Sequence, residues 1–175
     1  MANPALAAAS AFTDLKSSKH AALTIDIRDD MTIASIASAK GKAADVKAAL
    51  TAAYGVTPSD KLERVAGDGI AFIWHGPDQW LAVAERGANG RDLELELKPV
   101  LAGIAAVVDQ SDGRAVVRVS GSRVRDVLAK GIAIDLHPSV FKANSAAITH
   151  AAHIGIVMWQ LDEQPTYEIA MFRSF

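Results

Sequence analysis

The stretch between residues 107 and 136, VVDQSDGRAVVRVSGSRVRDVLAKGIAIDL, constrains the fold more than any other part of the chain. Within it, Ala115, Val117 and Val119 alternate with more polar residues and define one apolar face. Arg114 and Arg118 fall on the opposite face. An alternation with a period of two is typical of a half-buried β-strand, so we expect the arginines to point outward.

A short helix is predicted directly after this strand. Apolar residues recur at helical spacing between residues 122 and 130. Ser120 is the expected N-cap, because its hydroxyl could accept a hydrogen bond from an amide of the first turn. Gly131 is the expected left-handed residue at the helix end. The stretch is therefore interpreted as strand, turn, strand and capped helix.

The same two periodicities predict the other elements of the chain. Helices are expected at 41–54 and 91–101, and strands at 22–27, 31–38, 70–74, 80–85, 104–108, 146–159 and 166–173. Between residues 31 and 108 the order is strand, helix, strand, strand, helix, strand. This order indicates a ferredoxin-like split βαβ arrangement, in which an antiparallel sheet carries its helices on one face.

The predicted fold class is therefore α+β. We expect a loosely ordered N-terminal arm over residues 1–20, followed by a single α+β domain over residues 21–175. The domain should contain two similar halves, at about 31–108 and 107–175, because strands and a helix recur in the second half.

Composition narrows the possible functions. A net charge of −2 argues against nucleic-acid binding, which usually requires a basic excess. The absence of cysteine excludes disulfides, thiolate metal sites and thiol nucleophiles. No run of about 18 apolar residues is present, so no membrane helix is expected. The first twenty residues lack an early positive charge and include Pro4, which argues against a secretory signal, and we expect a cytoplasmic protein.

Neither a dinucleotide nor a metal site is indicated by the motifs. The run 67–69, Gly-Asp-Gly, lacks the third glycine and the following helix of a dinucleotide site, so it is interpreted as the entry to a hairpin. His150 and His153 are three residues apart in a predicted strand, where they would point to opposite faces. We therefore expect no metal-binding and no cofactor-binding residue in this chain.

Catalytic residues are not expected either. Asp109 and Asp112 flank a turn, where carboxylates commonly bind nearby backbone amides. The run 120–122 does not match the nucleophile elbow of serine hydrolases. The residues favour a binding or assembly module over an independent enzyme.

Basic and aromatic residues provide candidates for contact with a partner. The arginines form a solvated face or, alternatively, the rim of an interface with an acidic partner or a polyanionic ligand. The tryptophans are typical of a core, but tryptophan is also enriched in interface hot spots. The partner-contact candidates are Arg114, Arg118, Arg123, Trp80, Trp159, Arg173 and Phe175.

Four segments resemble the gamma subunit of heterotetrameric sarcosine oxidase, in the same order along the chain. Along the chain they are GPDQWLAVA (76–84), VVDQSDGRAVVRVSGSRVRDVLAKGIAIDLHPSVF (107–141), AHIGIVMWQLD (152–162) and YEIAMFRSF (167–175). Together they cover most of the chain from about residue 65 onward. That family is in turn similar to the folate-binding part of the glycine-cleavage aminomethyltransferases, which implies the same α+β, ferredoxin-like pieces.

The resemblance implies a function for the complex rather than for this chain alone. It implies oxidative demethylation of sarcosine to glycine, with hydrogen peroxide formed and tetrahydrofolate as the one-carbon acceptor. Alpha, beta and delta subunits are the implied partners, and they would carry FAD, FMN, NAD, tetrahydrofolate and zinc. The gamma chain is expected to hold no cofactor and to serve assembly, and to self-associate when isolated if its interface is apolar.

One departure from the aminomethyltransferases supports the non-catalytic interpretation. Those enzymes carry an acidic pair after a Gly-Gly-hydrophobic run, whereas residues 153–158 of this chain, HIGIVM, contain no carboxylate. Two alternatives stay open at this point. The chain could be a stand-alone module that binds a small, folate-like ligand, or an independent enzyme similar to the aminomethyltransferases.

Overall fold

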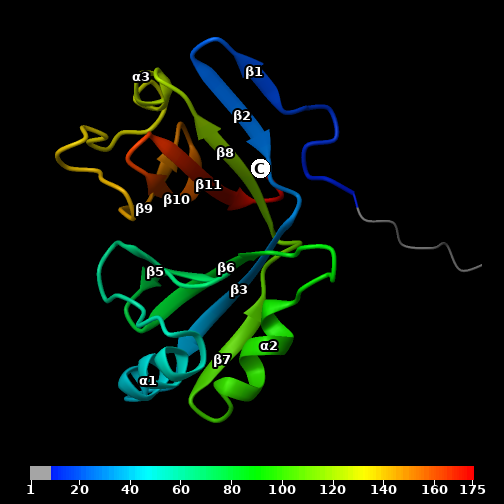
Figure 1. The fold of residues 1–175 in the computed structure, drawn as a ribbon, viewed down its shortest axis with the longest axis vertical. Coiled ribbons are helices and arrows are strands. Elements are labelled where there is room, and N and C mark those ends of the chain that lie inside the picture. Colours follow the sequence, from blue (N-terminus) through cyan, green and yellow to red (C-terminus); the bar gives the residue numbers. More distant parts are fainter. Residues whose placement is uncertain (1–8) are drawn as a thin grey trace, which may run out of the picture.

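The computed structural model describes residues 9–175, which form two antiparallel β-sheets and three helices (Figure 1). The helices are α1 (Ala43–Tyr54), α2 (Leu93–Val100) and α3 (Val124–Leu128). The strands are β1 (Ser18–His20), β2 (Leu23–Ile27), β3 (Met31–Ser38), β4 (Arg64–Ala66), β5 (Ala71–Gly76), β6 (Gln79–Glu85), β7 (Ala105–Asp109), β8 (Arg114–Ser120), β9 (Ala146–Ala151), β10 (Ile154–Asp162) and β11 (Thr166–Phe172).

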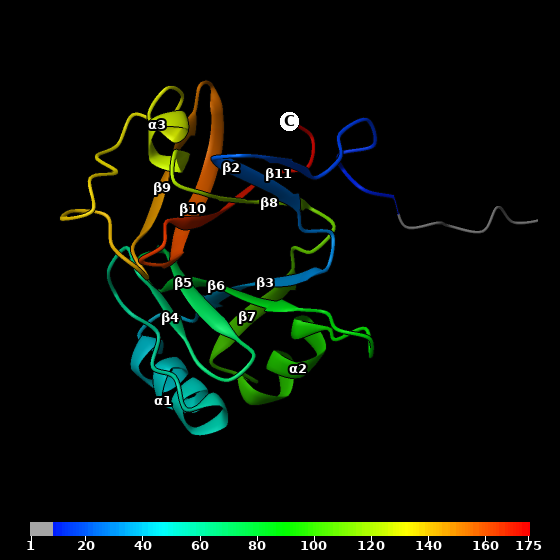
Figure 2. The same cartoon turned by 45° about the horizontal axis from the view of Figure 1, so that its top comes forward.

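The two sheets lie face to face, with helices only on their outer sides (Figure 2). The five-stranded sheet has the order β4-β5-β6-β3-β7, and α1 and α2 cover its outer face. The six-stranded sheet has the order β1-β2-β8-β11-β10-β9, and α3 lies on its far side. The predicted α+β class, with antiparallel sheets and helices packed on one face, is confirmed.

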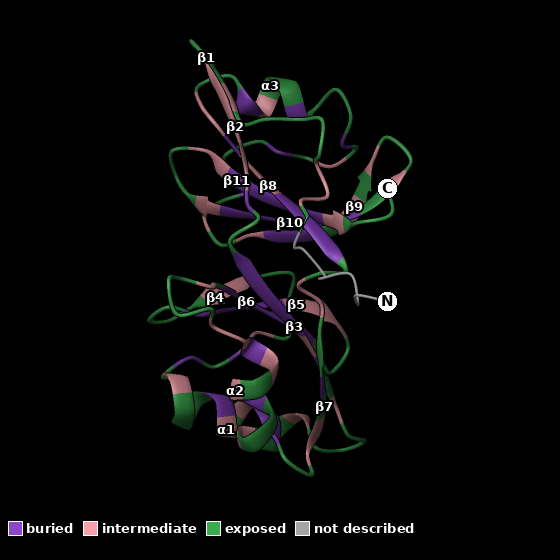
Figure 3. Ribbon diagram, turned by 90° about the vertical axis from the view of Figure 1, so that its right-hand side faces the viewer, coloured by how far each residue is buried: buried purple, intermediate pink, exposed green. Residues whose placement is uncertain are grey.

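Three hydrophobic clusters hold these layers together. One lies between the five-stranded sheet and α1 and α2, and a second lies between the two sheets. The third lies under α3 and the loop that follows it. Buried residues are accordingly concentrated in the central strands of both sheets, among them β3, β6 and β10 (Figure 3). One cluster therefore joins the two sheets.

Helix α2 shows how the sequence specifies its element. The Asp92 side chain accepts hydrogen bonds from the amides of Glu94 and Leu95, which satisfies two unpaired donors of the first turn. Leu93, Leu97 and Leu101 form the predicted buried stripe, and all three are fully buried.

Helix α3 is shorter than predicted, and both of its expected caps are wrong. Ser120 belongs to β8, where it pairs with Thr24, and the N-cap residue is Arg123, without a side-chain cap bond. Strand β8 ends just before Gly121, whose φ is +120°. A Cβ atom at this position would lie 2.5 Å from the carbonyl oxygen of Ala22. The chain leaves the sheet at this close approach. Gly131, which was expected to be the left-handed residue at the helix end, does not have a positive φ.

The long strand predicted over 146–159 is also wrong. It is a hairpin of β9 and β10, and Ala152 adopts a left-handed φ of +52° between them. His150 therefore pairs with Gly155 across the hairpin, whereas His153 lies in the turn. The two histidines are thus not members of one strand.

The N-terminal arm expected over residues 1–20 is only partly described. Residues 1–8 lie outside the described part of the chain. Ser18–His20 form β1, which pairs with β2, and β2 continues the six-stranded sheet through β8. The sheet that contains the C-terminal half thus also contains strands from the N-terminal end, and residues 28–30 carry the chain from this sheet to the other.

Candidate functional site

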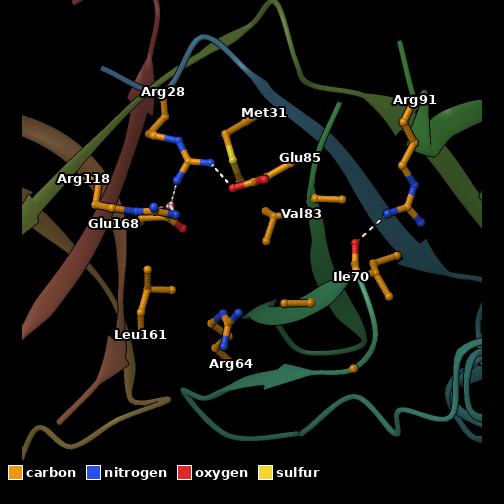
Figure 4. A pocket seen from close by; sticks show the side chains of 14 residues that line it. Arg28, Met31, Arg64, Ile70, Val83, Glu85, Arg91, Arg118, Leu161 and Glu168 are labelled. Carbon is orange, nitrogen blue, oxygen red and sulfur yellow. Dashed lines mark hydrogen bonds and ion pairs between the residues drawn. The ribbon is translucent and has the colours of Figure 1, made fainter. Parts of the chain in front are cut away.

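A cavity of about 460 Å³ opens between the two sheets, close to where the chain crosses from one sheet to the other (Figure 4). Its apolar wall includes Met31, Ile70, Val83 and Leu161. Its polar wall consists of four arginines and two glutamates: Arg28, Arg64, Arg91, Arg118, Glu85 and Glu168.

Glu168 on β11 is the centre of the polar wall. Its side chain is buried, and one carboxylate oxygen accepts hydrogen bonds from Arg28 Nη1 at 2.8 Å and from Arg118 Nη2 at 2.7 Å. The other oxygen accepts a hydrogen bond from Trp159 Nε1 at 2.9 Å. Both oxygens are therefore engaged by donors from within the chain, as a buried carboxylate requires.

Arg28 links this carboxylate to the crossing segment. Its guanidinium also forms ion pairs with Asp30 at 2.8 Å and with Glu85 at 2.5 Å, and its side chain is only 7% exposed. Burial opposes the charge of Arg28, but Asp30 and Glu168 outweigh it and hold its pKa above the ordinary value. Burial raises the pKa of Glu168, and Arg28 and the indole of Trp159 counteract this rise in part.

The remaining basic groups of the cavity come from the five-stranded sheet and its helix layer. Arg91 is held by Glu96 and donates to the carbonyl oxygen of Gly69, so its charge is paired at the mouth. Arg64 donates to the side chain of Asn144 at 3.0 Å and points toward the open centre of the cavity (Figure 4). Burial lowers the pKa of Arg64, which the charge of Glu168 counteracts in part.

This arrangement favours a structural ion-pair network over catalysis. A general acid or base must direct a lone pair or proton at a substrate, whereas the carboxylate of Glu168 is buried and each of its oxygens already accepts a hydrogen bond from within the chain. Among residues 9–175, no group of three or more His, Asp or Glu side chains could hold a metal ion. The cavity can admit a small molecule, but its one buried carboxylate is neutralised by its neighbours.

The structure places the predicted partner-contact arginines in different environments. Arg118 lines the cavity and pairs with Glu168, and Arg114 is buried. The expectation that both point outward is wrong, because the five-stranded sheet covers the face of β8 that they share with Val116. Arg123 is exposed and pairs only with Asp126, one turn along the helix.

The predicted aromatic contacts divide in the same way. Trp80 and Trp159 are fully buried, and their indole N–H groups donate within the chain, so both belong to the core in this conformation. Phe175 is 70% exposed, and Arg173 beside it is also exposed and donates to the carbonyl oxygen of Ala9. Of the seven partner-contact candidates, only Arg123, Arg173 and Phe175 are thus exposed at the surface.

Asp109 behaves as its turn position predicts. Its carboxylate accepts hydrogen bonds from the backbone and hydroxyl of Ser111. The run 67–69 forms the turn between β4 and β5, which agrees with its interpretation as a hairpin entry.

Sequence reasoning missed the two central residues of the cavity, Arg28 and Glu168. A signal for Glu168 was present, because it is the only charged residue in the otherwise apolar strand segment 167–172, YEIAMF. A single carboxylate on an apolar strand indicates a buried partner of opposite charge. Arg28 carried no such signal, since it follows β2 in a polar turn.

Comparison with known proteins identifies the family. Residues 38–175 match the model of the sarcosine oxidase, gamma subunit family. The chain belongs to this family. Sarcosine oxidase subunit gamma of Arthrobacter sp. is 39% identical over 123 residues, and that of Corynebacterium sp. (strain P-1) is 38% identical over 123 residues. Each alignment covers 69% of this chain and 59% of the relative, so the match spans well under two thirds of these relatives' length.

Solved structures extend the likeness to almost the whole chain. The gamma-family chain superposes on a chain of the heterotetrameric sarcosine oxidase from Corynebacterium sp. U-96 in complex with pyrrole 2-carboxylate, with a TM-score of 0.81 and 29% identity. This match covers 96% of the present chain and 88% of that one. Glycine cleavage system aminomethyltransferase T from Bartonella henselae shares the fold, with a TM-score of 0.59, 12% identity, and coverage of 88% and 43%.

None of the helices described in this gamma-family chain has the length and apolar character needed to cross a membrane.

Proposed function

We propose that this chain is a non-catalytic gamma subunit of a cytoplasmic, heterotetrameric sarcosine oxidase, and that its role is assembly. The likeness to a chain of the Corynebacterium sp. U-96 complex over 96% of the present chain carries this proposal. The complex would oxidatively demethylate sarcosine to glycine, form hydrogen peroxide, and transfer the one-carbon unit to tetrahydrofolate. Its other chains would be the alpha, beta and delta subunits.

The cavity supports a non-catalytic role for this chain. Among residues 9–175, Glu168 is the only buried carboxylate, and two guanidinium groups and an indole already neutralise it. In this proposal FAD, FMN, NAD, tetrahydrofolate and zinc belong to the partner subunits. This chain would contribute shape and surface rather than reacting groups.

Co-expression of the tagged chain with the other three subunits tests the proposal. We expect one purified assembly of four chains with flavin absorbance and sarcosine-dependent hydrogen peroxide production. The chain expressed alone should be colourless and inactive toward sarcosine. Turnover by the chain alone, or failure to purify with any of the other chains, would overturn the proposal.

The cavity itself supports a second candidate, a module that binds a folate-like ligand. Its volume of about 460 Å³ lies within the range of small-molecule pockets, and Arg64 points into it. Titration of the isolated chain with tetrahydrofolate, followed by tryptophan fluorescence, separates the two candidates. Saturable binding that Arg64→Met abolishes would favour the module, and no change in fluorescence would leave assembly as the function.

A further inference from the structure

A second, smaller pocket lies at another end of the space between the sheets, outside the cavity described above. It measures about 220 Å³ and is formed by the end of β5 on one side and by β8–β11 on the other. His75 belongs to the five-stranded sheet, and Arg114, Ile148, His150 and Phe172 belong to the six-stranded sheet.

Arg114 in this pocket is a buried charge without a counter-charge. Its side chain is only 9% exposed, and within residues 9–175 no carboxylate lies within 4.0 Å of its guanidinium. Its Nε makes no hydrogen bond, and its Nη2 lies 3.5 Å from His75 Nε2. A buried guanidinium without an anion is costly, because the desolvation of the charge is not offset.

The neighbours of Arg114 do not supply the missing negative charge. Burial lowers the pKa of Arg114, and burial together with the charge of Arg114 lowers the pKa of His75. Imidazole is either neutral or positively charged, so His75 supplies no negative charge. Phe172 lies under the guanidinium, with its ring centroid 4.7 Å away, which orients the group but offsets only part of its desolvation.

The rim of the pocket is apolar and open to solvent. Phe172 is 49% exposed and Ile148 is 46% exposed, on neighbouring parts of the same sheet. Strand β9, which carries Ile148, is the edge strand of this sheet. A buried arginine surrounded by exposed aromatic and aliphatic residues is typical of the centre of a protein–protein interface.

We propose that the Arg114 pocket receives an aspartate or glutamate side chain from another subunit, and that apolar residues beside it pack on Ile148 and Phe172. A carboxylate can take two parallel hydrogen bonds from a guanidinium, which matches the donors that Arg114 leaves unused. The volume holds one side chain rather than a folded segment. This inference rests on the proposed function, since it assigns the partner contact of the gamma-like subunit.

The test compares variants in the four-chain complex. Arg114→Met should weaken retention of this chain by at least about 30-fold, because it leaves a partner carboxylate buried without its guanidinium. Arg114→Lys should restore part of the affinity. Arg123→Met is the matched control, because Arg123 is exposed and pairs only with Asp126, and it should change the affinity by less than about twofold.

Stability of the isolated chain separates docking from folding. Because Arg114 has no internal anion, Arg114→Met should unfold at the same temperature as the wild type or higher. A competitor provides a second measurement that needs no variant. Propionate should weaken assembly of the wild-type chain more than chloride at equal ionic strength, and this difference should vanish in Arg114→Met.

The outcomes are distinct. Equal retention of wild type and Arg114→Met, or equal effects of propionate and chloride on the wild type, would overturn the docking proposal and leave the proposed function intact. Propionate binding to the isolated chain through Arg114, without an effect on assembly, would assign the pocket to a small carboxylate and also overturn docking. If the wild-type chain does not join the other subunits, the proposed function fails and docking fails with it.

Discussion

Replacement of Glu168 by glutamine should destabilise the chain by about 3 kcal/mol, which is large for a change of one atom. Two guanidinium groups bind one oxygen of Glu168, and the indole of Trp159 binds the other. Glutamine has only one acceptor oxygen, so an amide NH₂ group must face either the indole or the two guanidinium groups. A broken buried ion pair costs about 3–5 kcal/mol, and the lower end applies because Arg28 keeps its pairs with Asp30 and Glu85.

Urea unfolding of the isolated chain, followed by tryptophan fluorescence, measures this change in the free energy of unfolding. Glu94→Gln is the matched control, since it removes a carboxylate that pairs with Lys98 across one turn of α2 near the surface. That pair contributes at most about 0.5 kcal/mol. Equal effects of the two substitutions would refute the conclusion that Glu168 is the centre of a buried ion-pair network.

Three further outcomes are expected. Asp92→Ala should lower the free energy of unfolding by about 1 kcal/mol in urea titrations, because two amides of α2 lose their acceptor. Gly121→Ala should lower the free energy of unfolding by more than about 2 kcal/mol, since the added Cβ meets backbone at a positive φ. Gly131→Ala is the control, because the space around Gly131 is open, and it should change this free energy by less than about 0.5 kcal/mol. The pKa of His75 is lowered in the folded chain, so the unfolded chain takes up its proton at a higher pH. The wild type should therefore lose stability relative to His75→Gln as the pH falls below about 6.5. Urea midpoints at two pH values measure this difference.

Local patterns predicted most elements because their causes are local. The stripe of Leu93, Leu97 and Leu101 and the glycine after Tyr54 define α2 and the end of α1 within a few residues. The order of strands and helices between residues 31 and 108 was sufficient to predict an antiparallel sheet with helices on one side. The fold class could therefore be derived before any tertiary contact was known.

Long-range pairing could not be derived in the same way. Strand β2 pairs with β8, about ninety residues further along the chain, and no local pattern specifies that partner. Hairpins whose turns lack a strong signal were also missed, because Ala152 at φ +52° is not a residue that predicts a turn. Period-two alternation identifies the two faces of a strand but not what covers each of them.

The two arginines of β8 show what this limit means for function. Arg114 and Arg118 share one face of the strand, and the pairing of β8 with β11 places Phe172 opposite the first and Glu168 opposite the second. Since the second sheet covers this face, both guanidinium groups need an anion. The chain supplies one to Arg118 and none within 4.0 Å to Arg114 among the described residues. Two residues with the same place in the sequence pattern therefore have different roles, and the missing counter-charge is the reason to look for it on another subunit.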